Sequence, residues 1–279
     1  MMSVKIVSDS ACDIPKELAD ELGIHVVPLY VNFGEESLKD GIDIKADDFY
    51  ERLISGPIHP FTSQPSPGDF LDIYKKLDDD NDGIISIHLS SKLSGTFKSA
   101  SIASEDQSLK SKITVIDTSH VSMSSGLCVL EAARLAKSGS DMDTIIQATN
   151  DFANRAHFVG LLDTLVYLEK GGRIGKARSM LGSLLNIKPM ITVENGESKE
   201  FGKARTFKKG IAKLTDFCNQ FEQIQSLSVV YSTDSDLAKE FSDSLSSLLG
   251  SKPIISRIGP VTGTHSGPGT IGVGLISKI

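Results

Sequence analysis

Three segments of the sequence place small hydroxyl side chains beside glycine or proline, and these are the residues with which the chain could do chemistry. They are FTSQPSPG at residues 61–68, SSKLSGTF at residues 90–97 and GPVTGTHSGPGT at residues 259–270. Serine and threonine hydroxyls donate hydrogen bonds without carrying a charge, and glycine lets a ligand approach the backbone closely. Hydroxyls held in this way suit a binding site for a carboxylate or a phosphate group.

The segment at residues 90–97 is predicted to join a strand to the first turn of a helix. A helix N-terminus offers free backbone N–H groups and a partial positive charge, which together attract anions. Gly95 keeps the backbone accessible there, and Ser94 and Thr96 add hydroxyls. The alternative interpretation is that Ser94 is simply the N-cap of this helix.

The other two segments offer hydroxyls and a histidine. In the first, Thr62 and Ser63 are short donors in a loop that prolines stiffen, and the alternative is an ordinary N-cap loop for a helix at residues 70–77. In the third, the glycines predict a loop around His265. A histidine there could donate to an anion or titrate near neutral pH, or it could be purely structural.

Several common catalytic patterns are missing from the sequence. Gly-x-Ser-x-Gly is absent, and no Gly-x-Gly-x-x-Gly follows the first predicted strand. His-x-x-x-His and Cys-x-x-Cys are also absent, so we expect no metal and no cofactor. The acidic run at residues 78–83 lacks the glutamate of a calcium loop and is predicted to be a solvated turn. Ser94 with His265 remains the alternative: a serine esterase or thioesterase.

Strands and helices alternate along the first half of the chain, which favours an α/β fold with a mostly parallel sheet flanked by helices. Ligands bind at the carboxyl ends of the strands in such sheets, so residues 9–13 and 90–97 are expected at the site. Asp13 is expected to cap the first helix, and Gly23 to end it. The strands are predicted at residues 3–8, 24–31, 83–89 and 113–117, and the helices at 46–55, 70–77, 124–137 and 142–156.

The second half predicts an α+β domain with an antiparallel sheet. Its clearest signal is Asn195-Gly196, a hairpin turn between strands at residues 189–194 and 197–202. We place the domain boundary near residue 155, which gives domains at residues 1–155 and 156–279. The other strands are predicted at residues 158–162, 227–231, 254–258 and 272–276, and the helices at 176–185, 207–221 and 235–248.

The composition is that of an ordinary globular protein, with 279 residues of which 39% are hydrophobic. No apolar run is long enough to span a membrane and no signal peptide is visible, so no stable membrane insertion is expected. The cysteines, Cys12, Cys128 and Cys218, are odd in number and far apart, which favours a reducing, cytoplasmic compartment. We expect them to be small buried hydrophobes, although Cys12 near a helix start could have a lowered thiol pKa.

Charge is unevenly distributed along the chain, whose net charge is −7. Residues 170–213, the basic segment, carry 11 lysines and arginines against three glutamates. Such a segment indicates either a contact with something anionic or a solvated face. The acidic total and the lack of aromatic residues interleaved with the bases argue against nucleic-acid binding.

The chain resembles the DegV family of bacterial fatty-acid-binding proteins from residue 4 to about residue 277. The motifs that carry the resemblance are residues 9–15 (Asp-Ser, then Asp-Ile-Pro), 62–66 (TSQPS), 90–96 (SSKLSGT), 168–174 (LEKGGRI), 188–189 (KP), 202–206 (GKART) and the segment around His265. The resemblance implies a two-domain fold with a long-chain fatty acid, such as palmitate, bound between the domains. It implies lipid transport or fatty acid metabolism rather than catalysis, and we expect a monomer.

The resemblance also assigns roles to individual residues. It implies that Thr62 and Ser94 bind the fatty-acid carboxylate with His265 close by, within the candidate set Thr62, Ser63, Ser94, Gly95, Thr96 and His265. In some family members the protein presents its fatty acid to a dihydroxyacetone-kinase-like subunit, which makes an acyl phosphate. By the same resemblance, Arg173 and Arg205 in the basic segment are candidates for docking that fatty acid kinase subunit or for contacting the transferred phosphate.

Overall fold

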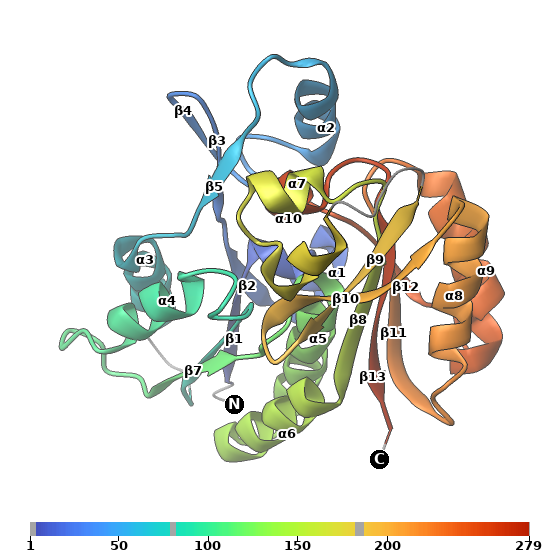
Figure 1. The fold of residues 1–279 in the computed structure, drawn as a ribbon. Helices are drawn as coiled ribbons and strands as arrows, with labels where there is room; N and C mark the ends of the chain where they lie inside the picture. Colours follow the sequence, from blue (N-terminus) through green and yellow to red (C-terminus); the bar gives the residue numbers. More distant parts are fainter. Residues whose placement is uncertain (1–3, 79–81, 182–186, 279) are drawn as a thin grey trace.

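A computed structural model describes residues 4–78, 82–181 and 187–278. Helices and sheets alternate in five layers, with the two larger sheets on either side of a central helical layer (Figure 1). The expected mixed fold, a parallel sheet flanked by helices plus a largely antiparallel sheet, is confirmed.

The first sheet is parallel throughout and has the strand order β2-β1-β6-β7. Its four strands are β1 (Lys5–Asp9), β2 (Ile24–Val27), β6 (Ile84–His88) and β7 (Ile113–Asp117). One face packs against α3 (Pro67–Leu77) and α4 (Thr96–Ser104). The other face packs against α1 (Lys16–Leu22), α5 (Ser122–Lys137) and α6 (Met142–Arg155). Strand side chains alternate between the two faces, which places Ile6 in one core and Val7 in the other.

The second sheet has six strands in the order β10-β9-β8-β13-β11-β12, antiparallel except for the β11–β12 pair. They are β8 (Ala156–Leu161), β9 (Lys188–Glu194), β10 (Glu197–Ala204), β11 (Ile224–Tyr231), β12 (Ile254–Arg257) and β13 (Ile271–Ser277). Helices α8 (Phe207–Cys218) and α9 (Ser235–Leu249) cover its outer face. The predicted hairpin is confirmed: Asn195 and Gly196 both have positive φ, as the turn requires.

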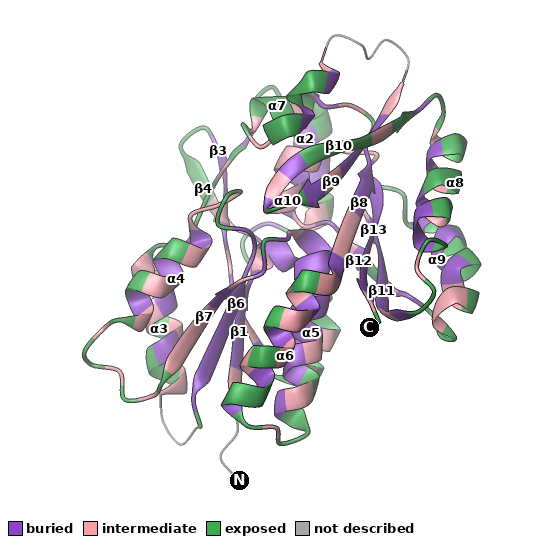
Figure 2. Cartoon of the chain, turned by 60° about the horizontal axis from the view of Figure 1, so that its bottom comes forward, coloured by how far each residue is buried: buried purple, intermediate pink, exposed green. Residues whose placement is uncertain are grey.

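Helix α5 joins the two sheets into one body. Its side chains pack in a single core with Ile6 and Ile85 of the first sheet and with Val230 and Ile276 of the second. Twelve of its 16 residues are buried, and Figure 2 shows α5 between the strands of the two sheets. Because the core is shared, the division of the chain near residue 155 stays a prediction.

A three-stranded antiparallel sheet lies beside the carboxyl ends of the first sheet, near the short helices α7 and α10 (Figure 1). It corrects one prediction, because the expected strand at residues 24–31 is split around Pro28, and its second part belongs to this sheet. The remaining elements are β3 (Tyr30–Phe33), β4 (Glu36–Lys39), β5 (Phe61–Ser63), α2 (Ala46–Ser55), α7 (Val166–Lys170), α10 (Pro260–Ser266) and the 3₁₀ turns η1 (Ser10–Cys12) and η2 (Gly175–Met180).

Three other local predictions are wrong. Asp13 does not cap α1, whose N-cap is Pro15; it is buried with φ 52° and ends η1, although Gly23 does end α1. His265 lies on helix α10 rather than in a loop. The helix expected at residues 176–185 is only the 3₁₀ turn η2 where the structure describes it, and residues 182–185 lie outside the described part.

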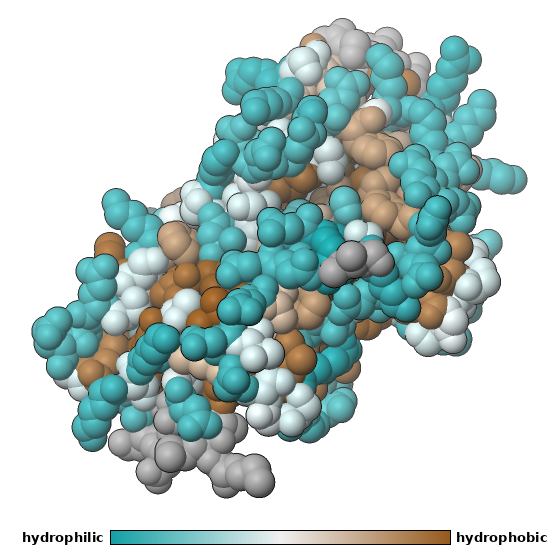
Figure 3. Space-filling model, turned by 90° about the horizontal axis from the view of Figure 1, so that it is seen from below, coloured by the Kyte–Doolittle hydropathy of each residue, from teal (hydrophilic) through white to brown (hydrophobic). Residues whose placement is uncertain are grey.

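The three cysteines are free and buried, as expected. Burial raises the pKa of the Cys12 thiol, so the lowered value considered for it is wrong. The cytoplasmic location stays a prediction. None of the helices at residues 4–78, 82–181 and 187–278 is both long and apolar enough to cross a bilayer. Figure 3 shows one face covered mainly by hydrophilic side chains, with hydrophobic ones in separate smaller areas.

Candidate ligand-binding site

A cavity of about 400 Å³ lies where the three sheets meet. It is within the size range of small-molecule sites, and twelve of its 24 lining residues are apolar, while eight of the others carry a hydroxyl. Its walls come from the loops after β1 and β6, from β5, α5, α7 and α10, and from strands β8 to β10. The apolar lining residues are Ala11, Leu29, Leu89, Leu93, Val121, Phe158, Leu162, Leu168, Ile191, Val193, Ile258 and Val261.

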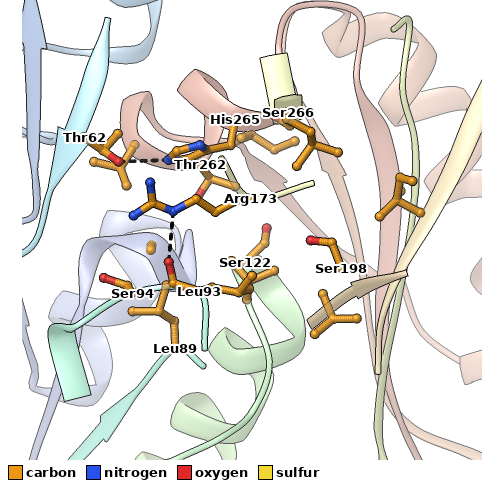
Figure 4. Close-up of a pocket in the computed structure, with 18 of the residues that line it drawn as sticks. Thr62, Leu89, Leu93, Ser94, Ser122, Arg173, Ser198, Thr262, His265 and Ser266 are labelled. Atoms are coloured by element: carbon orange, nitrogen blue, oxygen red, sulfur yellow. Dashed lines mark hydrogen bonds between the residues drawn. The ribbon is translucent and has the colours of Figure 1, made fainter. Parts of the chain in front are cut away.

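Thr62 and His265 form one polar part of the lining. Thr62 Oγ1 lies 2.8 Å from His265 Nε2, which joins β5 to α10 across the cavity rim (Figure 4). His265 packs tightly against Gly171, since a Cβ atom at Gly171 would lie 2.1 Å from His265 Nδ1. That Nδ1 atom is buried and has no hydrogen-bond partner within the described residues. The two candidates from distant segments are therefore brought together.

The Ser94 segment contributes a second polar part. Ser94 lines the cavity, and its Oγ lies 2.9 Å from Thr96 Oγ1 while accepting a hydrogen bond from the Thr96 backbone N–H (3.3 Å). The N-cap of α4 is Gly95, so the alternative that Ser94 is the N-cap is wrong, and Ser94 lies in the cavity wall instead. Ser63 also lines the cavity, whereas Gly95 and Thr96 are not among the lining residues. Gly95 is packed against Gln64, whose side chain a Cβ atom would meet at 2.1 Å.

Arg173 lies in the cavity wall. Its Nε donates to the Leu93 carbonyl (3.1 Å) and its NH1 to the Gly171 carbonyl (2.8 Å), which ties the end of α7 to the Ser94 segment. Arg205 is exposed and is not part of the lining. The two arginines therefore separate: Arg173 faces the ligand space, and Arg205 faces solvent.

His265 is neutral in this environment. Burial, with smaller effects from Arg173 and His59, lowers the pKa of His265 to about 3. This argues against the alternative that His265 titrates near neutral pH. A neutral imidazole can form hydrogen bonds but carries no positive charge.

The esterase alternative finds no support in the hydrogen bonding. His265 Nε2 is bonded to Thr62, and no bond joins it to Ser94 in the part of the chain that the structure describes. A serine–histidine–aspartate chain does exist elsewhere, from Ser86 through His88 (2.7 Å) to Asp9 (2.9 Å). All three are fully buried in the core of the first sheet, out of reach of a substrate.

Two buried carboxyl groups, those of Asp13 and Asp40, lie next to Gly259 at the start of α10. The Gly259 N–H donates to Asp13 Oδ1 (2.9 Å), and the Ser122 hydroxyl donates to Asp13 Oδ2 (2.6 Å). Burial raises the pKa of Asp13 to about 8 and that of Asp40 to about 7. Both residues are close to Gly259, the residue before α10, so their ionisation bears on how that helix is held.

Sequence reasoning missed most of the cavity wall. Thr262 and Ser266 line the cavity together with His265. The spacing of these three residues is that of one helix face, but the surrounding glycines led us to predict a loop. Ser122 and Ser198 also line the cavity, and no pattern singled them out. The apolar members of β8 and β9 were identified only as strand residues.

Three of the eleven basic residues in the basic segment form ion pairs among the described residues. Lys176 bonds Glu197 (2.9 Å), Lys199 bonds Glu194 (2.5 Å), and Lys188 forms an ion pair with Asp163. These pairs support the interpretation of a solvated face for part of the segment.

Comparison with known proteins places this architecture in a family. A family model described as "Uncharacterised protein, DegV family" matches residues 3–278. The chain belongs to the DegV family. A DegV domain-containing protein of Caldanaerobacter subterraneus subsp. tengcongensis is 37% identical over 278 residues, which covers 98% of each chain.

Solved structures of a DegV family protein and of a second fatty-acid-binding protein have the same fold. A DegV family protein from Thermus thermophilus, described as fatty-acid binding, superposes with a TM-score of 0.91 at 33% identity, covering 99% of this chain and 100% of its own. A protein from Eubacterium ventriosum described as binding stearic acid gives a TM-score of 0.89 at 29% identity, covering 100% of this chain and 99% of its own.

Proposed function

We propose that this DegV protein is a non-enzymatic carrier that binds one long-chain fatty acid, such as palmitate or stearate, in the cavity. The carboxylate lies at Thr62 and Ser94, and the acyl chain lies among the apolar side chains. The observation that carries the proposal is the composition of the lining, in which Thr62, His265, Ser94 and Arg173 accompany twelve apolar residues. The ligands named for the Thermus thermophilus and Eubacterium ventriosum proteins support it.

The acyl chain supplies most of the affinity. Burying about 14 methylenes gains about 11 kcal/mol at about 0.8 kcal/mol each. Association and ordering of the chain offset several kcal/mol of this gain. The polar groups add less affinity, and their effect is to determine which end of the ligand lies at Thr62.

The hydrogen bonding explains how a neutral histidine helps to hold a carboxylate. Thr62 has one O–H, which cannot donate to both His265 and a ligand. If Nε2 of His265 carries the proton, it donates to Thr62 Oγ1 and leaves the threonine O–H free for the carboxylate. In that tautomer Nδ1 carries no proton, and it has no hydrogen-bond partner within the described residues. Arg173 adds a positive charge nearby.

The resemblance to the DegV family extends the proposal, because some family members present their fatty acid to a kinase subunit. We propose that, where a dihydroxyacetone-kinase-like subunit is present, this protein presents the bound carboxylate to it. Arg205 is the better docking candidate because it is exposed, whereas Arg173 lies in the cavity wall.

The test uses the double variant Thr62→Ala plus Ser94→Ala. Wild-type protein is expected to carry fatty acid through purification, which mass spectrometry detects after denaturation, and the double variant is expected to lose it. Ser91→Ala, an exposed serine three residues before Ser94, is the control and should retain lipid. Full retention of lipid by a folded double variant would overturn the assignment of the carboxylate site.

A further inference from the structure

Ser198 is a polar residue of the cavity wall that lies far from the Thr62 and Ser94 side of the cavity (Figure 4). It lies on β10 opposite Val193 of β9, and both side chains line the cavity. Ser198 is 5% exposed. Its hydroxyl has no hydrogen-bond partner among residues 4–78, 82–181 and 187–278. Figure 4 shows Ser198 on the opposite side of the cavity from Thr62 and Ser94.

The backbone around Ser198 is held in place. A Cβ atom at Gly175 of η2 would lie 2.7 Å from the Ser198 carbonyl oxygen, so the two backbones are in close contact. On the other side, Ser198 is in register with Val193 in the antiparallel pair. The backbone that carries the Ser198 hydroxyl is therefore fixed beside the cavity.

An unsubstituted acyl chain would leave this hydroxyl in an unfavourable state. Methylenes packed over Ser198 exclude water and offer no hydrogen bond, and a buried hydroxyl without a partner costs free energy. A ligand with a hydrogen-bonding group along its chain would remove that cost. A site built around a polar group also discriminates strongly against a ligand that lacks its partner.

We infer that the preferred ligand is a hydroxy fatty acid, whose chain hydroxyl bonds Ser198 while its carboxylate lies at Thr62. This inference rests on the proposed function, because the position of the carboxylate sets which part of the chain reaches Ser198. The ligand is then recognised by two polar groups, its carboxylate at Thr62 and its chain hydroxyl at Ser198.

The experiment compares stearic acid with a series of monohydroxystearic acids that differ in hydroxyl position, titrated into delipidated protein. At least one hydroxystearic acid is expected to bind the wild type about tenfold more tightly than stearic acid. Ser198→Ala should abolish this preference, because the affinity for the hydroxy acid should fall and the affinity for stearic acid should rise. Ser198→Thr, which keeps a hydroxyl, should retain it, and Ser179→Ala on the exposed side of η2 should have no effect.

The outcomes separate the inference from the proposed function. If stearic acid binds but no hydroxy acid is preferred, or if Ser198→Ala leaves the preference unchanged, the role of Ser198 is wrong and the carrier function stands. If no fatty acid binds the folded wild-type protein, the proposed function fails, and the inference fails with it.

Discussion

Thr62 and His265 are 203 residues apart in the chain, yet their side chains meet at 2.8 Å. One lies on β5 of the small sheet and the other on α10, which packs against that sheet. The meeting point lies on the cavity lining, next to Ser63. The polar end of the site is therefore assembled by the tertiary fold and exists only when the small sheet and α10 are docked together.

Removing the Thr62 hydroxyl should weaken ligand binding. Thr62→Val keeps the shape of the side chain and deletes the donor. Since hydrogen bonds to charged groups contribute about 1.5–3 kcal/mol, the affinity for palmitate should fall at least about tenfold by calorimetry. Thr144→Val, at an exposed position on α6, should bind like the wild type. Equal affinities for Thr62→Val and the wild type would place the carboxylate elsewhere.

The two arginines should give different results. Arg173→Met removes a positive charge from the cavity wall and should lower fatty-acid affinity about tenfold or more, because that charge lies near the proposed position of the carboxylate. Arg205→Met changes an exposed residue and should leave the affinity unchanged. With a kinase subunit added, Arg205→Met should slow acyl-phosphate formation.

The same pair of variants can contradict the assignment. Equal lipid affinity for Arg173→Met and the wild type would return Arg173 to the role of a docking residue. Loss of lipid by both variants would mean that Arg205 also shapes the pocket, and the docking proposal would fail.

Gly171 controls the position of His265. In Gly171→Ala the new methyl group would lie 2.1 Å from His265 Nδ1, so the ring must move and its contact with Thr62 must break. Fatty-acid affinity should fall severalfold while the fold is retained. Gly202→Ala is the matched control, because nothing lies within 4 Å of its added Cβ atom. A wild-type affinity in Gly171→Ala would show that the His265 contact is dispensable.

The buried carboxyls predict an unusual dependence of stability on pH. Burial raises the pKa of Asp13 to about 8 and of Asp40 to about 7, whereas both groups ionise near 3.8 when unfolded. The folded state then holds more protons than the unfolded state between these values. The contribution of these two groups to the free energy of unfolding is complete below about pH 4 and is lost as the pH rises to about 8. For each group, the free energy of unfolding falls by at most about 1.4 kcal/mol per pH unit.

Asp13→Asn tests this dependence because the amide can still accept from Gly259 but cannot ionise. Denaturant unfolding between pH 5 and pH 8 should show a decline in the free energy of unfolding that is smaller in Asp13→Asn than in the wild type. The exposed Asp236→Asn should follow the wild type. A wild-type free energy that rises over this range, or the same decline in Asp13→Asn, would contradict the prediction.

The sequence predicted those parts of the fold that depend on local signals. The Asn195-Gly196 turn needs only two residues that tolerate positive φ, and β7 and α2 follow from short apolar patterns at residues 113–117 and 46–55. The break at Pro28 was missed, because the choice of sheet for the following strand depends on distant partners.

Helix α10 shows why the site was harder to predict than the fold. Its glycines suggested a loop, but Gly263 is required by packing, since a Cβ atom there would lie 2.5 Å from the Tyr50 hydroxyl. That contact spans most of the chain and leaves no local pattern. The position of the Arg173 side chain in the cavity wall also depends on tertiary contacts. The Leu93 and Gly171 carbonyls accept its hydrogen bonds only in the folded chain.

The most direct test of the carrier function is native mass spectrometry of freshly purified protein, followed by denaturation and identification of what is released. The proposed function predicts a mass excess over the apo chain that is released as one fatty acid with about 14 to 18 carbons. An apo mass that persists after incubation with several fatty acids would contradict it.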